Sequence, residues 1–338
     1  MTALAAAYAR LAPGRRVHGI AATLLPYAAT GAIDWNGFAA HVARTHGAGL
    51  AVAVNMDTGF GDLLSVAERS VVLAATRDAL GPGVIFYAGA FADAGDLDAG
   101  DLVVGYHAAL AAISARGAIP VIVQHRAMHG MPPRALADLY GRIAAAVERA
   151  LAFELGPMFA PHGAIWDDDT FRRLLDIPAL IGAKHSSLDR DREFARLALR
   201  DRLRPEFRVY TGNDLAIDMA AYGSDYLLGL STFAPAAFAA RDRALAAGDA
   251  AFLSINDALQ HLGNVAFRAP VPAYKHAAAM FLHLTGALAG DAIHPRAPRR
   301  PQSDRILLAD CARRLAPFTS AASGPLPPRP PHEPHDRR

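Results

Sequence analysis

The sequence predicts a (β/α)8 barrel followed by a C-terminal appendage of three helices. Eight short apolar segments rich in Val, Ile, Leu and Phe alternate with longer segments whose apolar residues recur at helical spacing. Continuous apolar strands separated by helices are typical of parallel strands buried on both faces, and eight such units in about 230 residues match a barrel. The rival fold is a doubly wound open sheet, but no G-x-G-x-x-G follows the first apolar segment, which argues against a dinucleotide-binding fold.

The elements are expected in strict alternation. The expected strands are 17–24, 49–54, 84–90, 119–124, 151–155, 178–183, 207–211 and 226–230. The expected helices between them include 67–80, 102–115, 133–150, 168–175, 189–200 and 214–222. Beyond about residue 248 the strand pattern stops, and three more helices are expected at 250–265, 271–288 and 303–315.

These patterns divide the chain into three parts. We expect a catalytic barrel at 1–248 and a C-terminal helical region at 249–318. The last stretch, 319–338, is rich in Pro, His and Arg and is expected to be disordered.

Composition limits the possible partners and location. Hydrophobic residues make up 52% of the 338 residues, charged residues 20%, and the net charge is +2, which argues against nucleic-acid or membrane partners. Cys311 is the single cysteine, so no internal disulfide is possible, and a reducing compartment is favoured. The N-terminus is a poor signal peptide and no apolar run is long enough to span a membrane, so we expect a cytoplasmic protein.

Candidate site residues follow from strand order. In a barrel of this type the catalytic groups lie at the C-terminal ends of the strands and in the loops that follow. Seven strand ends supply candidates, which are Thr23, Asp57, Thr58, Gly59, His125, Arg126, Glu154, Lys184, Gly212 and Ser231.

Lys184 is the most informative candidate. The chain has 34 Lys and Arg residues, but only Lys184 and Lys275 are lysines. Burial at a strand end lowers the pKa of an ammonium group and gives a nucleophilic amine, which can form a Schiff base with a carbonyl. An Arg side chain stays charged and cannot do this, whereas Lys275, on a predicted C-terminal helix, is expected to be structural.

Several motifs resemble the dihydrodipicolinate synthase/N-acetylneuraminate lyase family. The opening segment 18–69 contains "GIAATLLP", "GAIDW" and a T-G loop followed by "LSVAE", and "IGAKHSSLD" resembles the segment around the family's Schiff-base lysine. Segments 210–235 and 269–286 resemble the last two strands and the C-terminal helices of the family. The resemblance covers roughly 17–315 and implies a metal-independent class I lyase barrel, commonly a homotetramer, that binds a 2-oxo acid such as pyruvate through an imine.

The chain departs from the family at several site positions. The carboxylate-binding loop of the family usually reads T-T-G-E, whereas this loop reads Asp57-Thr58-Gly59-Phe60. Asp57 would repel a substrate carboxylate by roughly one to a few kcal/mol unless it is protonated or turned away, or unless the substrate presents another group there. Arg126 could bind a carboxylate in place of the lost threonine.

The family's proton-shuttling tyrosine is also absent. It aligns with Phe153, or with Glu154 if the register slips by one residue. Neighbouring residues of a strand point to opposite faces, so only one of the two can face the barrel interior. We expect Glu154 to face inward as the general base; if Phe153 does so instead, His125 is the better candidate, with Asp57 as a third acid–base group.

A metal site is a weaker alternative. His125, His129, His162 and Asp57 could together hold a divalent ion, as in a class II lyase or a hydrolase. We expect no metal or other cofactor, because the spacing alone supports such a site only weakly.

The leading functional hypothesis is a class I Schiff-base lyase or aldolase, rather than a true dihydrodipicolinate synthase. It would act on a 2-oxo acid or another small carbonyl compound, with Thr58, Gly59, Thr23, Arg126, Gly212 and Ser231 in substrate binding. The alternatives are a Schiff-base dehydratase or deaminase of the same family, and a barrel that binds a ligand without catalysis. The expected partners are a small-molecule carbonyl substrate and further copies of the chain in a dimer or tetramer.

Overall fold

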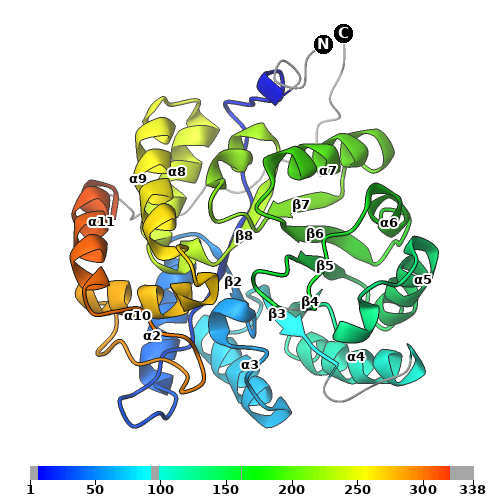
Figure 1. Ribbon diagram of the computed structural model, residues 1–338, viewed down its shortest axis with the longest axis horizontal. Coiled ribbons are helices and arrows are strands. Elements are labelled where there is room, and N and C mark those ends of the chain that lie inside the picture. Colours follow the sequence, from blue (N-terminus) through cyan, green and yellow to red (C-terminus); the bar gives the residue numbers. More distant parts are fainter. Residues whose placement is uncertain (1–6, 93–98, 161, 320–338) are drawn as a thin grey trace.

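Eight parallel strands close into a barrel in the computed structural model of the chain, and each strand pairs with the next one in sequence (Figure 1). The structure describes residues 7–92, 99–160 and 162–319, so the expected tail beyond residue 319 lies outside the described residues. The strands are β1 (Gly19–Ala22), β2 (Ala51–Val54), β3 (Phe86–Ala90), β4 (Ala118–Ile122), β5 (Ala150–Leu155), β6 (Leu180–Ser186), β7 (Arg208–Thr211) and β8 (Asp225–Leu228). Each overlaps one of the eight expected segments, which confirms the predicted fold class.

Helices surround the barrel (Figure 1). They are α2 (Trp35–Gly47), α3 (Val66–Leu80), α4 (Ala99–Ser114), α5 (Pro133–Ala144), α6 (Asp168–Leu174), α7 (Arg190–Leu203) and α8 (Pro235–Ala247). Two expected helices differ from the structure. The helix expected at 133–150 ends at Ala144, because the following residues turn back toward β5, and the one expected at 214–222 is a 3-10 helix, η3 (Ile217–Tyr222).

Local sequence explains where several helices begin. Ser65 accepts a hydrogen bond from the backbone N–H of Glu68, and Glu68 accepts one from the backbone of Ser65, so α3 starts with a capping box. Asp167 and Asp189 cap α6 and α7 in the same way, each accepting from backbone N–H groups of the first turn. These caps fix the start of helices directly after the loops that carry the candidate site.

The core has two layers. One apolar cluster fills the barrel itself and includes Ile20, Val121, Phe153 and Tyr210. The second, larger cluster lies between the strands and the helices. Both faces of every strand are therefore buried, as expected for parallel strands covered by helices.

Three helices follow α8 at the C-terminal side of the barrel (Figure 1). They are α9 (Ala251–Ala266), α10 (Tyr274–Leu284) and α11 (Asp304–Thr319), which confirms the expected appendage. Helix α9 packs on α8 and α11, and α10 packs on α11. The start of α10 reaches the loop that follows β2, where Tyr274 donates a hydrogen bond to Asp57.

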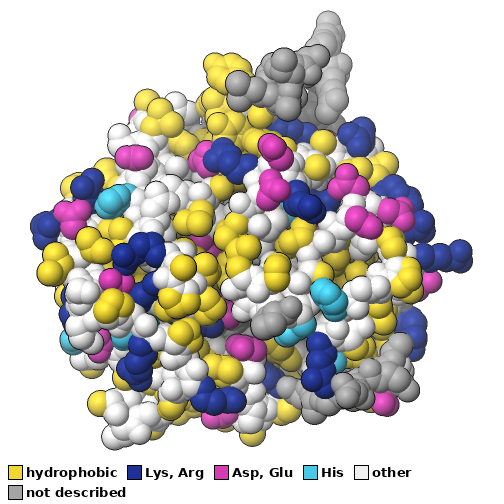
Figure 2. All heavy atoms as spheres, viewed as in Figure 1, with side chains coloured by type: hydrophobic (Ala, Val, Ile, Leu, Met, Phe, Trp, Pro, Cys, Tyr) yellow, Lys and Arg dark blue, Asp and Glu magenta, His cyan; other side chains and the backbone are white. Residues whose placement is uncertain are grey.

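Positive and negative side chains are interspersed over the face shown in Figure 2, in keeping with the small net charge. Within the described ranges, no helix is both long and apolar enough to cross a membrane.

Candidate active site

Lys184 lies at the C-terminal end of β6 with its side chain inside the barrel. It is 7% exposed, and its Nζ lies 4.3 Å from the centre of the Phe153 ring, over the ring face. Phe153 is the residue of β5 that pairs with Lys184, so the two side chains leave the sheet on the same side. The structure thus places the amine where strand order predicts it.

The surroundings of Lys184 favour an uncharged amine. Burial lowers the pKa of Lys184 to about 8, although the carboxylates of Asp214 and Asp57 act in the opposite direction. A pKa of about 8 leaves roughly a tenth of the molecules with a free amine at pH 7. The amine is therefore available as a nucleophile near neutral pH.

Two adjoining cavities lie at this end of the barrel. The inner cavity surrounds Lys184 and is lined by Asp57, Phe153, Leu155, Phe159, Lys184, Ser186, Gly212, Asp214, Gly229 and Tyr274. The outer cavity, of about 440 Å³, shares Asp57, Phe153, Leu155 and Phe159 with the inner one. The two cavities therefore adjoin at these four residues, and the inner one, of about 10 Å³, is much the smaller.

Asp57 lines both cavities and is held by two residues of α10. Its Oδ1 lies 2.7 Å from Lys275 Nζ, and its Oδ2 accepts a hydrogen bond of 2.8 Å from the Tyr274 hydroxyl. The same hydroxyl lies 2.8 Å from Thr58 Oγ1. Lys275 is 4% exposed, and this ion pair places it beside the candidate site.

Asp214 is a buried carboxyl group that strand order did not single out. It follows β7, is 4% exposed, and its Oδ1 accepts a hydrogen bond of 2.7 Å from the backbone N–H of Leu230. Burial raises the pKa of Asp214 to about 7, although the Leu230 N–H and the Lys184 ammonium favour the ionised form. A carboxyl group that exchanges its proton near pH 7, beside an amine, suits general acid–base chemistry.

Glu154 points away from the cavities, so the expected inward orientation is wrong. Its carboxylate lies against His185 and Arg196, at 2.5 Å from His185 Nδ1 and 3.1 Å from Arg196 Nε, and accepts from the backbone N–H of Trp166. Burial disfavours the charge of Glu154, but His185 and Arg196 outweigh it and lower its pKa. Phe153 faces inward instead, because it is in register with Lys184 while Glu154 is in register with His185.

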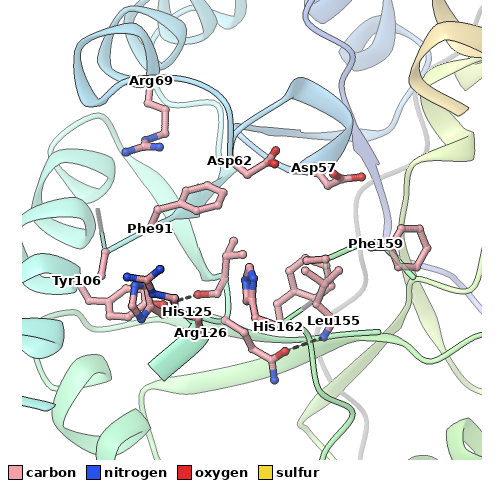
Figure 3. A pocket seen from close by; sticks show the side chains of 15 residues that line it. Asp57, Asp62, Arg69, Phe91, Tyr106, His125, Arg126, Leu155, Phe159 and His162 are labelled. Carbon is pink, nitrogen blue, oxygen red and sulfur yellow. Dashed lines mark hydrogen bonds between the residues drawn. The ribbon is translucent and has the colours of Figure 1, made fainter. Parts of the chain in front are cut away.

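His125 and Arg126 lie at the outer cavity, as expected for residues that follow β4 (Figure 3). They and His162 lie across this cavity from Asp57 and Asp62 (Figure 3). Burial and the nearby charges of Arg126 and His162 lower the pKa of His125, so its ring is neutral at pH 7. His125 Nδ1 accepts a hydrogen bond from the backbone N–H of Ala127, which fixes the start of a 3-10 helix.

The metal site considered above does not form among the described residues. In that part of the chain, no three His, Cys, Asp or Glu side chains lie close enough together to hold an ion. His129 is exposed, and Asp57 is paired with Lys275 rather than directed toward the histidines.

The small and hydroxyl-bearing candidates have different positions. Gly212 lines the inner cavity, and a Cβ there would lie 2.7 Å from Lys184 Cε. Thr58 does not line the inner cavity, and its hydroxyl is hydrogen-bonded to that of Tyr274, which does. Thr23 and Ser231 are buried and line neither cavity, and their hydroxyls donate to the backbone carbonyls of Ala21 and Leu228. Gly59 packs against the backbone of Thr23.

The site residues missed from the sequence are Asp214, Tyr274 and Lys275. Asp214 stands two residues after Gly212 in "TGND", so strand order could have included it. Lys275 had a weaker signal, its rarity as one of two lysines. No sequence signal indicated Tyr274, because it belongs to a helix far along the chain from the strands.

Comparisons with known proteins give one family match. A model of the family described as "Protein of unknown function (DUF993)" matches residues 6–294. No curated protein matches the chain.

Several solved structures are similar to this one. A dihydrodipicolinate synthase from Acinetobacter baumannii in complex with pyruvate has a TM-score of 0.72 and 21% identity, covering 89% of this chain and 99% of that one. YagE, a prophage protein of the dihydrodipicolinic acid synthase family from E. coli K12, has a TM-score of 0.76 and 18% identity, covering 88% and 98%. The sialic acid aldolase of Ruminococcus gnavus has a TM-score of 0.72 and 17% identity, covering 91% and 100%.

Identities this low establish a shared fold, while the family model covers most of the chain. The chain therefore belongs to the family described as "Protein of unknown function (DUF993)", and it has the barrel fold of the dihydrodipicolinate synthase/N-acetylneuraminate lyase family that its sequence resembles.

Proposed function

We propose that this protein is a Schiff-base lyase, in which Lys184 forms an imine with a 2-oxo acid or another small carbonyl compound. The observation that carries the proposal is the buried amine of Lys184, with a pKa of about 8, at the C-terminal end of a barrel strand and beside a cavity. A buried amine of this kind is the nucleophile that imine chemistry requires. The structures of the A. baumannii enzyme and of YagE, which share this fold, were both determined with pyruvate.

The chemical steps follow from the nucleophile. The free amine of Lys184 adds to the carbonyl carbon, and the carbonyl oxygen takes up two protons and leaves as water. The resulting protonated imine withdraws electrons from the neighbouring carbon, so that a C–C bond one carbon further away can break once the hydroxyl beyond it loses its proton. The electron pair forms an enamine, which is protonated on carbon and then hydrolysed to release the amine.

Asp214 is the best-placed group to carry these protons. It lines the same inner cavity as Lys184, and its pKa of about 7 allows it both to donate and to accept a proton near neutral pH. His125 is the second candidate, for groups that extend into the outer cavity. Glu154 has no part in this scheme, because its carboxylate is enclosed by His185 and Arg196 outside the barrel interior.

The alternatives differ in the bond that breaks. A dehydratase or deaminase would use the same imine and expel water or ammonia from the neighbouring carbons, whereas a ligand-binding barrel would form the imine without turnover. C–C cleavage or condensation remains our first choice, because an aldolase is among the relatives of similar fold.

Borohydride trapping tests the proposal. Wild-type protein is incubated with a panel of oxo acids, aldehydes and ketones, the imine is reduced, and the intact mass and the modified peptide are measured. We expect a covalent adduct on Lys184 that is absent from Lys184→Met and retained in Lys275→Arg, which keeps the second site cation. Failure of the whole panel to give an adduct would exclude the Schiff-base mechanism.

A further inference from the structure

The side chains around the imine carbon are rich in acidic groups. Any group bonded to that carbon lies about 1.5 Å from it and is therefore close to the residues that line the inner cavity. Besides Lys184, the ionisable side chains that line this cavity are Asp57, Asp214 and Tyr274. A substrate carboxylate next to the carbonyl would thus meet two carboxyl groups and a phenol.

The cation that could receive a substrate carboxylate is already paired with Asp57. Lys275 Nζ lies 2.7 Å from Asp57 Oδ1, and the Tyr274 hydroxyl donates to Asp57 Oδ2. The ammonium and the hydroxyl that could receive a substrate carboxylate are therefore both bound by a carboxylate of the chain itself. Lys275 does not line the inner cavity, so a substrate group there reaches Asp57 first.

The other basic side chains at this end of the barrel line the outer cavity. Arg69, His125, Arg126 and His162 line the outer cavity but not the inner one. They can face a distant part of a long substrate, but not a group bonded directly to the imine carbon.

Carboxyl oxygens accept hydrogen bonds from hydroxyl groups. The space beside the imine carbon therefore suits a hydroxyl-bearing carbon, which can donate to Asp57 or Asp214. We infer that the substrate is an α-hydroxy ketone or α-hydroxy aldehyde, and that Asp57 excludes 2-oxo acids by occupying the position of their carboxylate. This inference rests on the proposed function and narrows its substrate class.

Hydroxyacetone and pyruvate form a matched pair of probes, because both are three-carbon ketones and differ in having CH2OH or a carboxylate beside the carbonyl. Rates of reductive trapping on Lys184 are measured for both at pH 7.5 and divided by the rates for Nα-acetyl-lysine, which removes the difference in intrinsic reactivity. For the wild-type protein we expect a corrected preference for hydroxyacetone of at least about tenfold. Asp57→Asn and Asp57→Thr should shift this preference toward pyruvate by about tenfold, since both release Lys275 without adding charge.

The results of these trapping experiments distinguish the substrate inference from the Schiff-base mechanism. An equal or faster corrected rate with pyruvate in the wild-type protein would overturn the substrate inference and leave the Schiff-base mechanism standing. Adducts with other carbonyls but not with hydroxyacetone would overturn it as well. The absence of any adduct across the wider panel would instead overturn the mechanism. If neither Asp57 variant folds, the preference of the wild-type protein between hydroxyacetone and pyruvate tests the substrate inference by itself.

Discussion

At the residue scale, the environment of Lys184 explains why an Arg-rich chain keeps a lysine here. A guanidinium would stay charged in this buried position, whereas burial lowers the pKa of the Lys184 amine to about 8. The ring of Phe153, 4.3 Å away, still stabilises the protonated form by about 1–2 kcal/mol through its face.

Gly212 is required for this position of the lysine. A Cβ at residue 212 would lie 2.1 Å from Ser186 Oγ and 2.7 Å from Lys184 Cε, both within the inner cavity. We expect Gly212→Ala to reduce the rate of trapping more than about tenfold, because the lysine stem must move. Trapping kinetics and circular dichroism together distinguish this effect from unfolding.

Gly141 provides the matched control for Gly212. It lies in α5, and a Cβ there meets nothing within 4 Å. Gly141→Ala should leave trapping within about twofold of wild type and should stabilise the helix by about 0.5–1 kcal/mol. Wild-type trapping in Gly212→Ala would show that the lysine does not need this space.

Asp214 should raise the pKa of Lys184 measurably, because its carboxylate favours the ammonium form. Lysine labelled with 13C at Cε gives signals from only two residues, so the titration of each can be followed directly. We expect a midpoint of about 8 for Lys184 in the wild-type protein and a lower one in Asp214→Asn. The Lys275 signal serves as an internal reference, and Lys184→Met assigns the two resonances.

An unchanged or higher midpoint in Asp214→Asn would contradict this electrostatic coupling. The proposed role of Asp214 in proton transfer gives a second expectation for Asp214→Asn. Asp214→Asn should still form the reduced adduct, but any turnover identified for the wild-type protein should fall by about 100-fold or more.

At the scale of elements, the pairing of β5 with β6 decides which residues reach the substrate. The register of the two strands shifts between Ala150 and Leu151, where β6 contains one extra residue, and beyond this point Phe153 pairs with Lys184. Glu154 is consequently directed to the layer between strands and helices. There it ties β5 to His185 on β6 and to Arg196 on α7.

Glu154→Gln tests this structural role. The variant leaves the buried His185 without its carboxylate and Arg196 with Asp168 alone, and we expect the free energy of unfolding to fall by about 3–5 kcal/mol. Denaturant titration measures the loss, and Glu148→Gln, at an exposed position, should change stability by less than about 0.5 kcal/mol.

The pH dependence of this loss has a defined sign. The folded pKa of Glu154 is lowered, so its contribution is present above the unfolded value of about 4.3 and is lost as the pH falls through the folded value. The stability difference between wild type and Glu154→Gln should therefore narrow in acid. A difference that is small at pH 7, or constant down to acid pH, would contradict the assignment.

Helix α10 controls the charge at the site through Lys275. Its ammonium is paired with Asp57, and Asp57 in turn favours the protonated form of Lys184. Replacing Lys275 by Met removes a competing cation, so we expect the titration midpoint of Lys184 to rise above about 8 and trapping at pH 7 to slow. Lys275→Arg keeps the charge and should preserve both values. A fall in the midpoint of Lys275→Met would show that the two lysines are not coupled through Asp57.

At the scale of the whole molecule, the fold could be predicted from the sequence, because each β/α unit has its own apolar and helical pattern. Lys184 could be predicted as well, because strand order alone places it at the active end of a barrel. The orientation of β5 could not be predicted. All six of its residues are buried, so the sequence shows no alternation of apolar and polar residues that would tell which side chains face the barrel interior. Tyr274 and Lys275 lie 217 and 218 residues from Asp57, and no local pattern indicates such a contact.

The assembly of the whole molecule remains a prediction. The resemblance to a commonly tetrameric family leads us to expect a dimer or tetramer, and light scattering coupled to gel filtration measures the mass directly against the 35.7 kDa chain. A species of one chain mass across the micromolar range would contradict this expectation.

The placement of both lysines in buried positions also affects how the chain is cut by proteases. An endoproteinase that cleaves only after lysine has two target bonds here, and both side chains are enclosed in the folded protein. The native chain should resist this enzyme, whereas the unfolded chain should yield three fragments, ending at Lys184, Lys275 and Arg338. Reductive capture of a carbonyl on Lys184 would remove the first cut and leave two fragments, so a single gel lane would report which molecules had bound covalently.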